Sequence, residues 1–315
     1  MPLTARGVRA HSTNMTVDTA PAENAAARGF AFAFSAYFLW GLLPLYLKLV
    51  GHVPAVEVLA HRVLWSVPLA GMVLILLGRT ADVKAALRSP RTLAMATLTA
   101  ALISVNWGVY VWAIAAERTV EASLGYYINP LVSVLMGAVF LKERLSRLQM
   151  VAIALAAAAV ALLTVRAGGL PWVSLVLAFS FAVYGFFRKT LPIGPSQGFF
   201  LEVMVLCLPA LAYIAWLAMR GEGHFVLTAP ADMLLLVGCG VVTAGPLMLY
   251  GFGAKLLRLS TIGIMQYIAP SMIFLLAVFV FGEPFGETRL LAFGLIWIAL
   301  ALYSWSMYRD RGTPA

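Results

Sequence analysis

The chain has 315 residues, of which 62% are hydrophobic and only 11% are charged, and its formal net charge at pH 7 is +9. A water-soluble domain carries roughly a quarter of its residues as charged side chains, so most of this surface is expected to face lipid. The basic residues lie in short clusters between apolar runs, which fits a membrane surface and argues against a nucleic-acid partner.

Residues 1–28 come before the first apolar run. They are rich in Ala and Thr and lack apolar periodicity, which predicts a disordered cytoplasmic tail. No small-residue cleavage site follows a short apolar core, so the pattern is not that of a signal peptide.

Ten apolar runs of about twenty residues follow, each long enough to cross a hydrocarbon core of roughly 30 Å. They cover residues 30–50, 55–77, 93–116, 121–141, 145–165, 170–187, 197–219, 233–252, 261–281 and 285–308. The connectors are too short to hold a soluble domain, and residues 309–315 form a second tail. The sequence therefore predicts an all-α integral membrane protein with ten transmembrane helices.

The distribution of basic residues predicts the orientation. With a cytoplasmic N-terminus, the inside segments hold sixteen of the 22 Lys and Arg residues and the outside connectors hold four. Basic residues accumulate in cytoplasmic loops. We therefore expect a multi-pass protein of the bacterial inner (plasma) membrane with both termini in the cytoplasm.

The second half of the chain repeats the first at an offset of 140 residues. The alignment pairs residues 125–130 (GYYINP) with 265–270 (MQYIAP), Glu143 with Glu283, and Arg62 with Glu202. The two repeats, residues 29–166 and 168–308, contain five predicted spans each, and five is odd. The second repeat therefore enters the membrane from the opposite side, a plan typical of secondary transporters with a site near the midplane.

Several runs also carry a family resemblance. They are residues 40–44 (WGLLP), 57–66 (EVLAHRVLWS), 106–108 (NWG), 121–130 (EASLGYYINP), 184–189 (YGFFRK) and 266–270 (QYIAP). Their order and spacing resemble the RarD proteins of the EamA family, a branch of the drug/metabolite transporter superfamily. The resemblance implies ten helices in two EamA-like repeats and transport of a small molecule, commonly export, without fixing the substrate.

Polar and aromatic residues inside the spans are the candidates for a substrate site, because ionisable groups in lipid are costly. The candidates are Tyr37, Trp40, His61, Arg62, Asn106, Tyr126 and Asn129 in the first half, and Tyr184, Glu202, Thr243, Gln266 and Tyr267 in the second. Together they would suit an amphipathic or aromatic organic molecule. Packing or interface anchoring is the alternative for each aromatic residue taken alone.

Arg62 and Glu202 carry opposite charges at equivalent positions of the two repeats. We expect both to lie near the midplane, to pair across the cavity and to act as part of a gate. The alternative is that Glu202 forms its hydrogen bonds elsewhere and the symmetry is only ancestral.

Motifs for other chemistry are lacking in the sequence. There is no P-loop, GxSxG or HExxH motif, the histidines are scattered, and Cys207 and Cys239 lie in apolar runs without a CxxC or His partner. No catalytic residue, metal or cofactor is predicted. The expected partners are a small-molecule substrate and the lipid bilayer, and a homodimer stays open. The alternative function is an integral-membrane enzyme with a polar site at Glu57, His61 and Arg62.

Overall fold

The computed structural model describes residues 20–140, 142, 145–166, 169–190, 192–257 and 265–309, and every regular element that they form is helical. The elements are α1 (Ala20–Leu49), α2 (Ala55–Leu76), α3 (Thr80–Leu87), α4 (Pro90–Ala115), α5 (Thr119–Phe140), α6 (Arg147–Arg166), α7 (Trp172–Thr190), α8 (Pro195–Arg220), α9 (Pro230–Leu256), α11 (Ile268–Leu275), the π-helix η1 (Leu276–Val280) and α12 (Glu287–Arg309).

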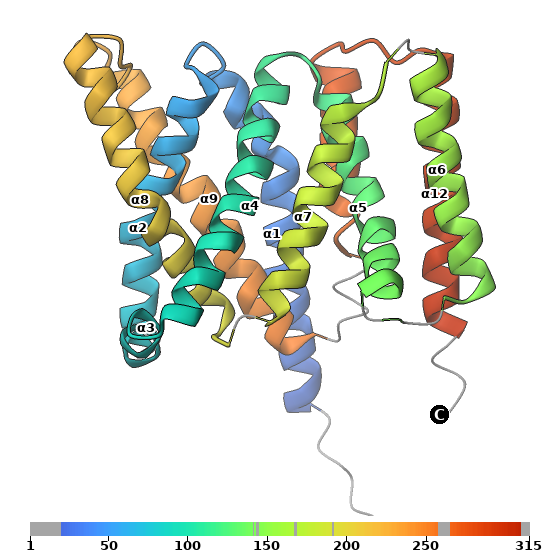
Figure 1. The fold of residues 1–315 in the computed structure, drawn as a ribbon, viewed down its shortest axis with the longest axis horizontal. Helices are drawn as coiled ribbons and strands as arrows, with labels where there is room; N and C mark the ends of the chain where they lie inside the picture. Colours follow the sequence, from blue (N-terminus) through green and yellow to red (C-terminus); the bar gives the residue numbers. More distant parts are fainter. Residues whose placement is uncertain are drawn as a thin grey trace, which may run out of the picture.

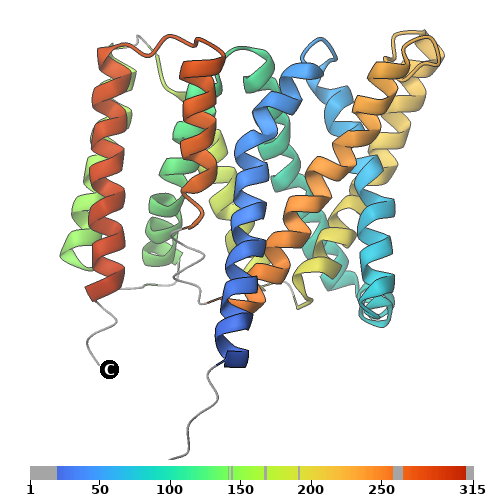
Figure 2. The same ribbon diagram turned by 180° about the vertical axis from the view of Figure 1, so that it is seen from behind.

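The longer helices run between the two ends of one bundle, whereas α11 and η1 together cover only the part of it next to one end (Figure 1). The end that carries the connectors at 50–54, 116–118, 221–229 and 281–286 is called the upper end here. The opposite, lower end carries α3. Seen from either side, α6 and α12 stand together at one edge, and α2 and α8 form the other edge (Figure 2).

Eight of the described helices are long and apolar enough to cross a membrane. The two remaining predicted spans, 170–187 and 261–281, coincide with shorter apolar helices at Trp172–Arg188 and Ile268–Val280. The first residues of the 261–281 span lie outside the described residues. The prediction of an all-α, multi-pass membrane protein is therefore confirmed.

Two segments differ from the expected pattern. Residues 20–28, which we expected in the tail, form the first turns of α1, because the run of alanines there has a high helix propensity. The connector at 79–91 contains the short helix α3, which is too short and too polar to resemble a span. Residues 1–19 and 310–315 of the two predicted tails, and Glu143, lie outside the described residues.

The helices of the first half pack mainly on those of the second half. The contacting helix pairs are α1–α9, α4–α7, α2–α9, α4–α8, α5–α7 and α1–α11. Three further contacts join α2 to α8, α5 to α11 and α6 to α12. In the middle of the bundle, Tyr127 of α5 stacks on Tyr267, just before α11, with ring centroids 6.5 Å apart.

Candidate functional site

Arg62 is the centre of the candidate site. It is the eighth residue of α2 and is only 3% exposed. At 1.5 Å per residue it lies about 10 Å below the upper end of the helix. Its Nε donates a hydrogen bond of 3.0 Å to Oγ1 of Thr243 in α9, which joins the first half of the chain to the second.

The sequence of α9 makes this contact possible. A Cβ atom at Gly240 would lie 2.4 Å from the backbone carbonyl of Trp65, so only glycine lets α9 approach α2 this closely. Thr243 follows one turn later on the same face. Its hydroxyl donates to the carbonyl of Cys239, which leaves the oxygen lone pairs free to accept from Arg62.

Aromatic residues of α4 and α5 surround the guanidinium. The Arg62 guanidinium carbon lies 5.1 Å from the ring centroid of Trp107, a cation–π contact. Tyr110 and Tyr126 lie close enough to interact electrostatically with Arg62, and their own rings meet edge to face at 5.6 Å. The site therefore combines one cation with three aromatic rings.

Asn106 fixes the far side of this group. Its amide nitrogen donates to the carbonyl of Leu177 and to the hydroxyl of Ser180 on α7, at 3.0 Å each. Its oxygen accepts from the hydroxyl of Tyr126 at 3.1 Å. Since every polar atom of this amide has a partner, Asn106 holds Tyr126 in place.

Two buried donors at this site have no hydrogen-bond partner in the described part of the chain: Nη1 of Arg62 and the hydroxyl of Tyr110. No described Asp or Glu forms an ion pair with Arg62 either. A buried arginine stays protonated. The positive charge of Arg62 is therefore not compensated by any anion in the described part of the chain.

The expected pair between Arg62 and Glu202 is wrong for this conformation. Glu202 of α8 forms an ion pair with Arg188, whose Nη1 lies 3.2 Å from Oε1 of Glu202. Its Oε2 accepts a hydrogen bond of 3.1 Å from the hydroxyl of Tyr184. A Cβ atom at Gly198 would lie 1.9 Å from Arg188 Nη1, so this glycine admits the guanidinium against α8.

The physical reason is the position of each residue along its helix. Arg62 is the eighth residue of α2 counted from the upper end, and Glu202 is the eighth residue of α8 counted from the lower end. The two charges are therefore each about 10 Å from opposite ends of a bundle about 33 Å thick, and about 13 Å apart along its axis. Neither lies at the midplane.

Glu57, His61 and Arg62, the polar residues of the alternative enzyme site, do not gather around one point. Glu57 accepts from the backbone N–H of His224 at 2.7 Å, and its second oxygen contacts His224 Nδ1 at 2.8 Å. His61 accepts from Trp65 Nε1 and stacks on Phe225, with ring centroids 5.1 Å apart. Both therefore serve the connector between α8 and α9, whereas Arg62 contacts Thr243.

The remaining candidates lie in separate groups. Tyr37 and Trp40 of α1 form an aromatic cluster with Tyr250 of α9. Asn129 of α5 donates to the carbonyl of Ala178 at 3.1 Å. Tyr267 lines a cavity of about 520 Å³ with Tyr127, Ser271 and Trp297, and Gln266 precedes it in the chain.

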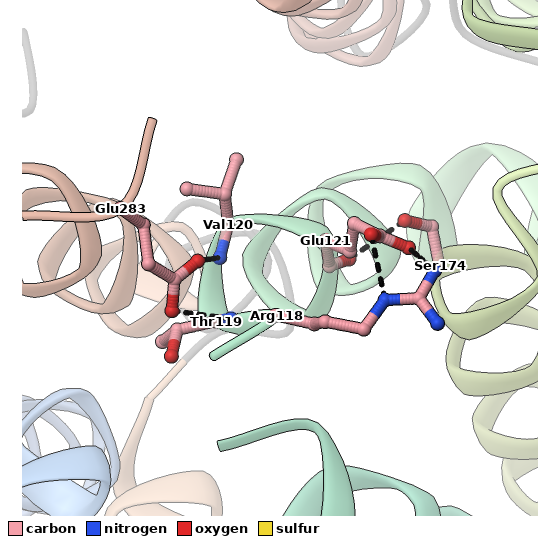
Figure 3. Close-up of polar contacts among 6 residues, drawn as sticks. All are labelled: Arg118, Thr119, Val120, Glu121, Ser174 and Glu283. Carbon is pink, nitrogen blue, oxygen red and sulfur yellow. Dashed lines mark hydrogen bonds and ion pairs between the residues drawn. The ribbon is translucent and has the colours of Figure 1, made fainter. Parts of the chain in front are cut away.

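Contacts at the upper end join the second half of the chain to the first. Glu283, in the connector before α12, accepts from the backbone N–H groups of Thr119 and Val120 at 2.7 and 2.9 Å (Figure 3). Glu283 is only 5% exposed. A carboxylate at a helix N-terminus satisfies unpaired N–H groups and the helix dipole, so Glu283 ties the second half to the start of α5.

Neighbouring contacts extend this tie. Arg118 forms a bidentate ion pair with Glu121 at 2.7 and 2.8 Å, and Ser174 of α7 donates to the carbonyl of Glu121 at 2.7 Å (Figure 3). His52 contacts Asp232 at 3.1 Å, which joins the connector before α2 to the start of α9.

Residue patterns alone did not single out two members of these groups. Trp107 belongs to the NWG run, but nothing in the sequence distinguishes it from the other aromatic residues. Arg188 belongs to the YGFFRK run at 184–189 but is not among the predicted site residues, although its position four residues after Tyr184 places both on one helical face. Among the described residues, no group of three or more His, Cys, Asp or Glu side chains could hold a metal ion.

Comparison with known proteins decides the family. Residues 27–165 match the model of the EamA-like transporter family. Protein RarD of Streptomyces exfoliatus is 45% identical over 288 residues, which cover 91% of this chain and 91% of that protein. The chain belongs to the RarD group of this family.

Other relatives agree with this membership. Protein RarD of Escherichia coli is 39% identical and covers 91% of this chain and 97% of that protein. An uncharacterized transporter of Vibrio cholerae is 42% identical and covers 90% of this chain and 94% of that protein. A solved crystal structure covers 90% of this chain and 98% of its own, at a TM-score of 0.58 and 23% identity, so the similarity there is one of fold. Family membership places the chain among membrane transporters.

Proposed function

We propose that this chain is a secondary transporter that exports a small organic molecule across the inner membrane by alternating access between two inverted five-helix repeats, residues 29–166 and 168–308. The observation that carries the proposal is the buried cluster around Arg62, which α2, α4, α5 and α9 form together from both halves. Binding groups at such an interface reach opposite sides of the membrane when the halves rock against each other.

The packing pattern supports the repeat. An exchange of the halves converts α1 into α7, α2 into α8, α4 into α9, α5 into α11 and α6 into α12. Under this exchange the α1–α9 contact becomes α7–α4, α2–α9 becomes α8–α4, and α5–α7 becomes α11–α1, and all six contacts are present. The stacked pair Tyr127 and Tyr267, which are 140 residues apart, marks where the pseudo-twofold axis would pass.

This conformation is proposed to be closed to the periplasm. By the distribution of basic residues, the upper end faces the periplasm and the lower end, with α3, faces the cytoplasm. Among the described residues, two contacts between a histidine and a carboxylate join the two halves at the upper end, Glu57 with His224 and His52 with Asp232. The tie from Glu283 to α5 lies there as well.

Orientation has a direct test. Single cysteines in the 79–91 connector and in the 221–223 connector, in a background without Cys207 and Cys239, are labelled with a membrane-impermeant maleimide in intact cells. We expect labelling at 221–223 and none at 79–91 until the cells are permeabilised. Equal labelling of both positions would contradict the proposed topology.

Transport is tested with strains that lack the protein, overproduce it, or overproduce Arg62→Lys or Arg62→Ala. A metabolite that the wild-type protein exports should accumulate in the medium only with that protein and should then be taken up by inside-out vesicles. Arg62→Lys should insert normally but lose most of this flux, because lysine lacks the planar donor fork. Identical media from all four strains, or full transport by Arg62→Ala, would contradict the proposal.

A further inference from the structure

Arg62 presents a positive charge that the described chain leaves uncompensated. Arg62 is 3% exposed, and its guanidinium has one hydrogen bond, from Nε to Thr243, and one aromatic contact, with Trp107. Nη1 has no partner in the described part of the chain. Taking a charge out of water without a counterion is strongly unfavourable, so a partner anion is expected when the site is in use.

Glu57 and Glu202, two buried acidic residues on α2 and α8, are already engaged. Glu57 accepts two contacts from His224 at the upper end, and Glu202 is bound by Arg188 and Tyr184 towards the lower end. Each carboxylate is therefore bound at a different depth of the bundle from Arg62. The counterion for Arg62 is therefore not supplied by either of these buried carboxylates.

The hydroxyl of Tyr110 is a second donor at this site without a hydrogen-bond partner among the described residues. This hydroxyl is buried, and Tyr110 follows one helical turn after Trp107, which contacts the Arg62 guanidinium. The hydroxyl of Tyr126, by contrast, already donates to Asn106. One acceptor group with two oxygens could satisfy both free donors at once, as a carboxylate does.

We propose that Arg62 and Tyr110 bind the carboxylate of an organic monoanion, and that Trp107 and Tyr126 contact its aromatic or other flat apolar portion. This inference rests on the proposed transport function and deepens it by naming the substrate class. A single uncompensated cation matches a single negative charge. A bare inorganic anion would leave the aromatic faces without a partner.

The same argument disfavours amino acids and amines. A zwitterion or a cation brings an ammonium group, which the uncompensated charge of Arg62 repels unless a carboxylate lies close to it. No described Asp or Glu interacts with Arg62, and the three buried glutamates, Glu57, Glu202 and Glu283, have partners of their own. The site is therefore expected to select benzoate-like acids over benzylamine and over phenylalanine.

Binding can be measured without transport. The purified protein in nanodiscs is titrated with benzoate, benzamide, benzylamine, phenylalanine and inorganic phosphate, and the thermal unfolding midpoint is followed, since a ligand that binds only the folded state raises it. We expect benzoate to raise the midpoint and to bind at least tenfold more tightly than its neutral isostere benzamide. Benzylamine and phenylalanine should give no shift.

Variants connect this shift to the site. Arg62→Gln should abolish the benzoate effect and Tyr110→Phe should weaken benzoate binding three- to tenfold. Arg166→Gln, an exposed arginine at the end of α6, should bind benzoate like the wild type. Thr243→Asp should act differently from all of these, because it places a resident carboxylate next to Arg62 Nε. This variant should unfold at a higher temperature without ligand and should no longer respond to benzoate.

Several results would overturn the inference: equal binding of benzamide and benzoate, stronger binding of inorganic phosphate than of benzoate, no binding of any probe, or an unchanged benzoate response in Thr243→Asp. The proposed function fails separately. Benzoate binding that depends on Arg62, together with no metabolite exported by the intact protein, would preserve the anion site and refute transport.

Discussion

Glu283 gives the most direct handle on the proposed closure of the upper end. The substitution Glu283→Gln preserves the shape of the side chain but removes its charge. The wild-type carboxylate accepts two backbone N–H groups at the start of α5, at 2.7 and 2.9 Å. The substituted amide retains one acceptor oxygen and turns its NH₂ group towards the second N–H.

The size of the effect follows from these two bonds. A hydrogen bond to a charged group contributes about 1.5–3 kcal/mol and a neutral one about 0.5–1.5 kcal/mol. Loss of one charged bond and weakening of the other therefore costs the closed upper end at least about 2 kcal/mol. This corresponds to a shift of roughly thirtyfold towards the open arrangement, at 1.4 kcal/mol per factor of ten.

The shift is measured by the reactivity of a cysteine below the closure. Ser123 is fully buried on α5, one turn below Thr119 and Val120. In a background without Cys207 and Cys239, Ser123→Cys should react with an impermeant maleimide in intact cells roughly thirtyfold faster when Glu283→Gln is added, by the bond energies above.

A matched control separates closure from general loosening of the fold. Glu287→Gln removes an equally negative but exposed side chain four residues later, and it should leave the labelling rate at the parent value. The reasoning is refuted if Glu283→Gln, folded and with an unchanged unfolding midpoint, labels Ser123→Cys no faster than the parent protein.

Two further predictions concern packing and the lower charge pair. Gly240→Ala should lower the unfolding midpoint, because its Cβ would lie 2.4 Å from the carbonyl of Trp65. As a control, Gly245→Ala, where the Cβ has open space around it, should leave the midpoint unchanged or raise it. An unchanged midpoint in Gly240→Ala would show that α2 and α9 do not approach as described. Arg188→Glu and Glu202→Arg should each reduce the yield of folded protein, and the double swap should restore part of it, because the two side chains form one ion pair. If the losses of folded protein in the two single variants simply add in the double swap, the ion pair contributes nothing to folding.

The helical framework could be predicted from the sequence because runs of apolar residues of membrane-spanning length have few alternative structures. The prediction failed where that signal is weak. Residues 20–28 contain too few large apolar residues to look like part of a span, and their helix depends on alanine propensity. The short helix α3 lies in a basic connector, where composition does not distinguish a helix from a loop.

The site was predictable in part for a related reason. Polar residues stand out in apolar spans, so Arg62, Asn106, Tyr126 and Thr243 were selected, and the fold brings them together. Which polar residue contacts which other was not predictable. The alignment of the two halves pairs Arg62 with Glu202, but the structure places them about 10 Å from opposite ends of the bundle. For this reason Arg62 and Glu202 do not meet, and Glu202 binds Arg188.

The central claim is that the two halves must separate at the upper end for transport to occur. His52 and Asp232 join the halves there, with side-chain atoms 3.1 Å apart. Cysteines at these two positions, in a background without Cys207 and Cys239, are joined in intact cells by a short bifunctional thiosulfonate, which bridges the gap left by the longer side chains and is released by reduction. Export of the metabolite found with the wild-type protein should stop on cross-linking and return on reduction, while each single cysteine variant transports under both conditions. Full export by completely cross-linked protein would contradict alternating access between the halves.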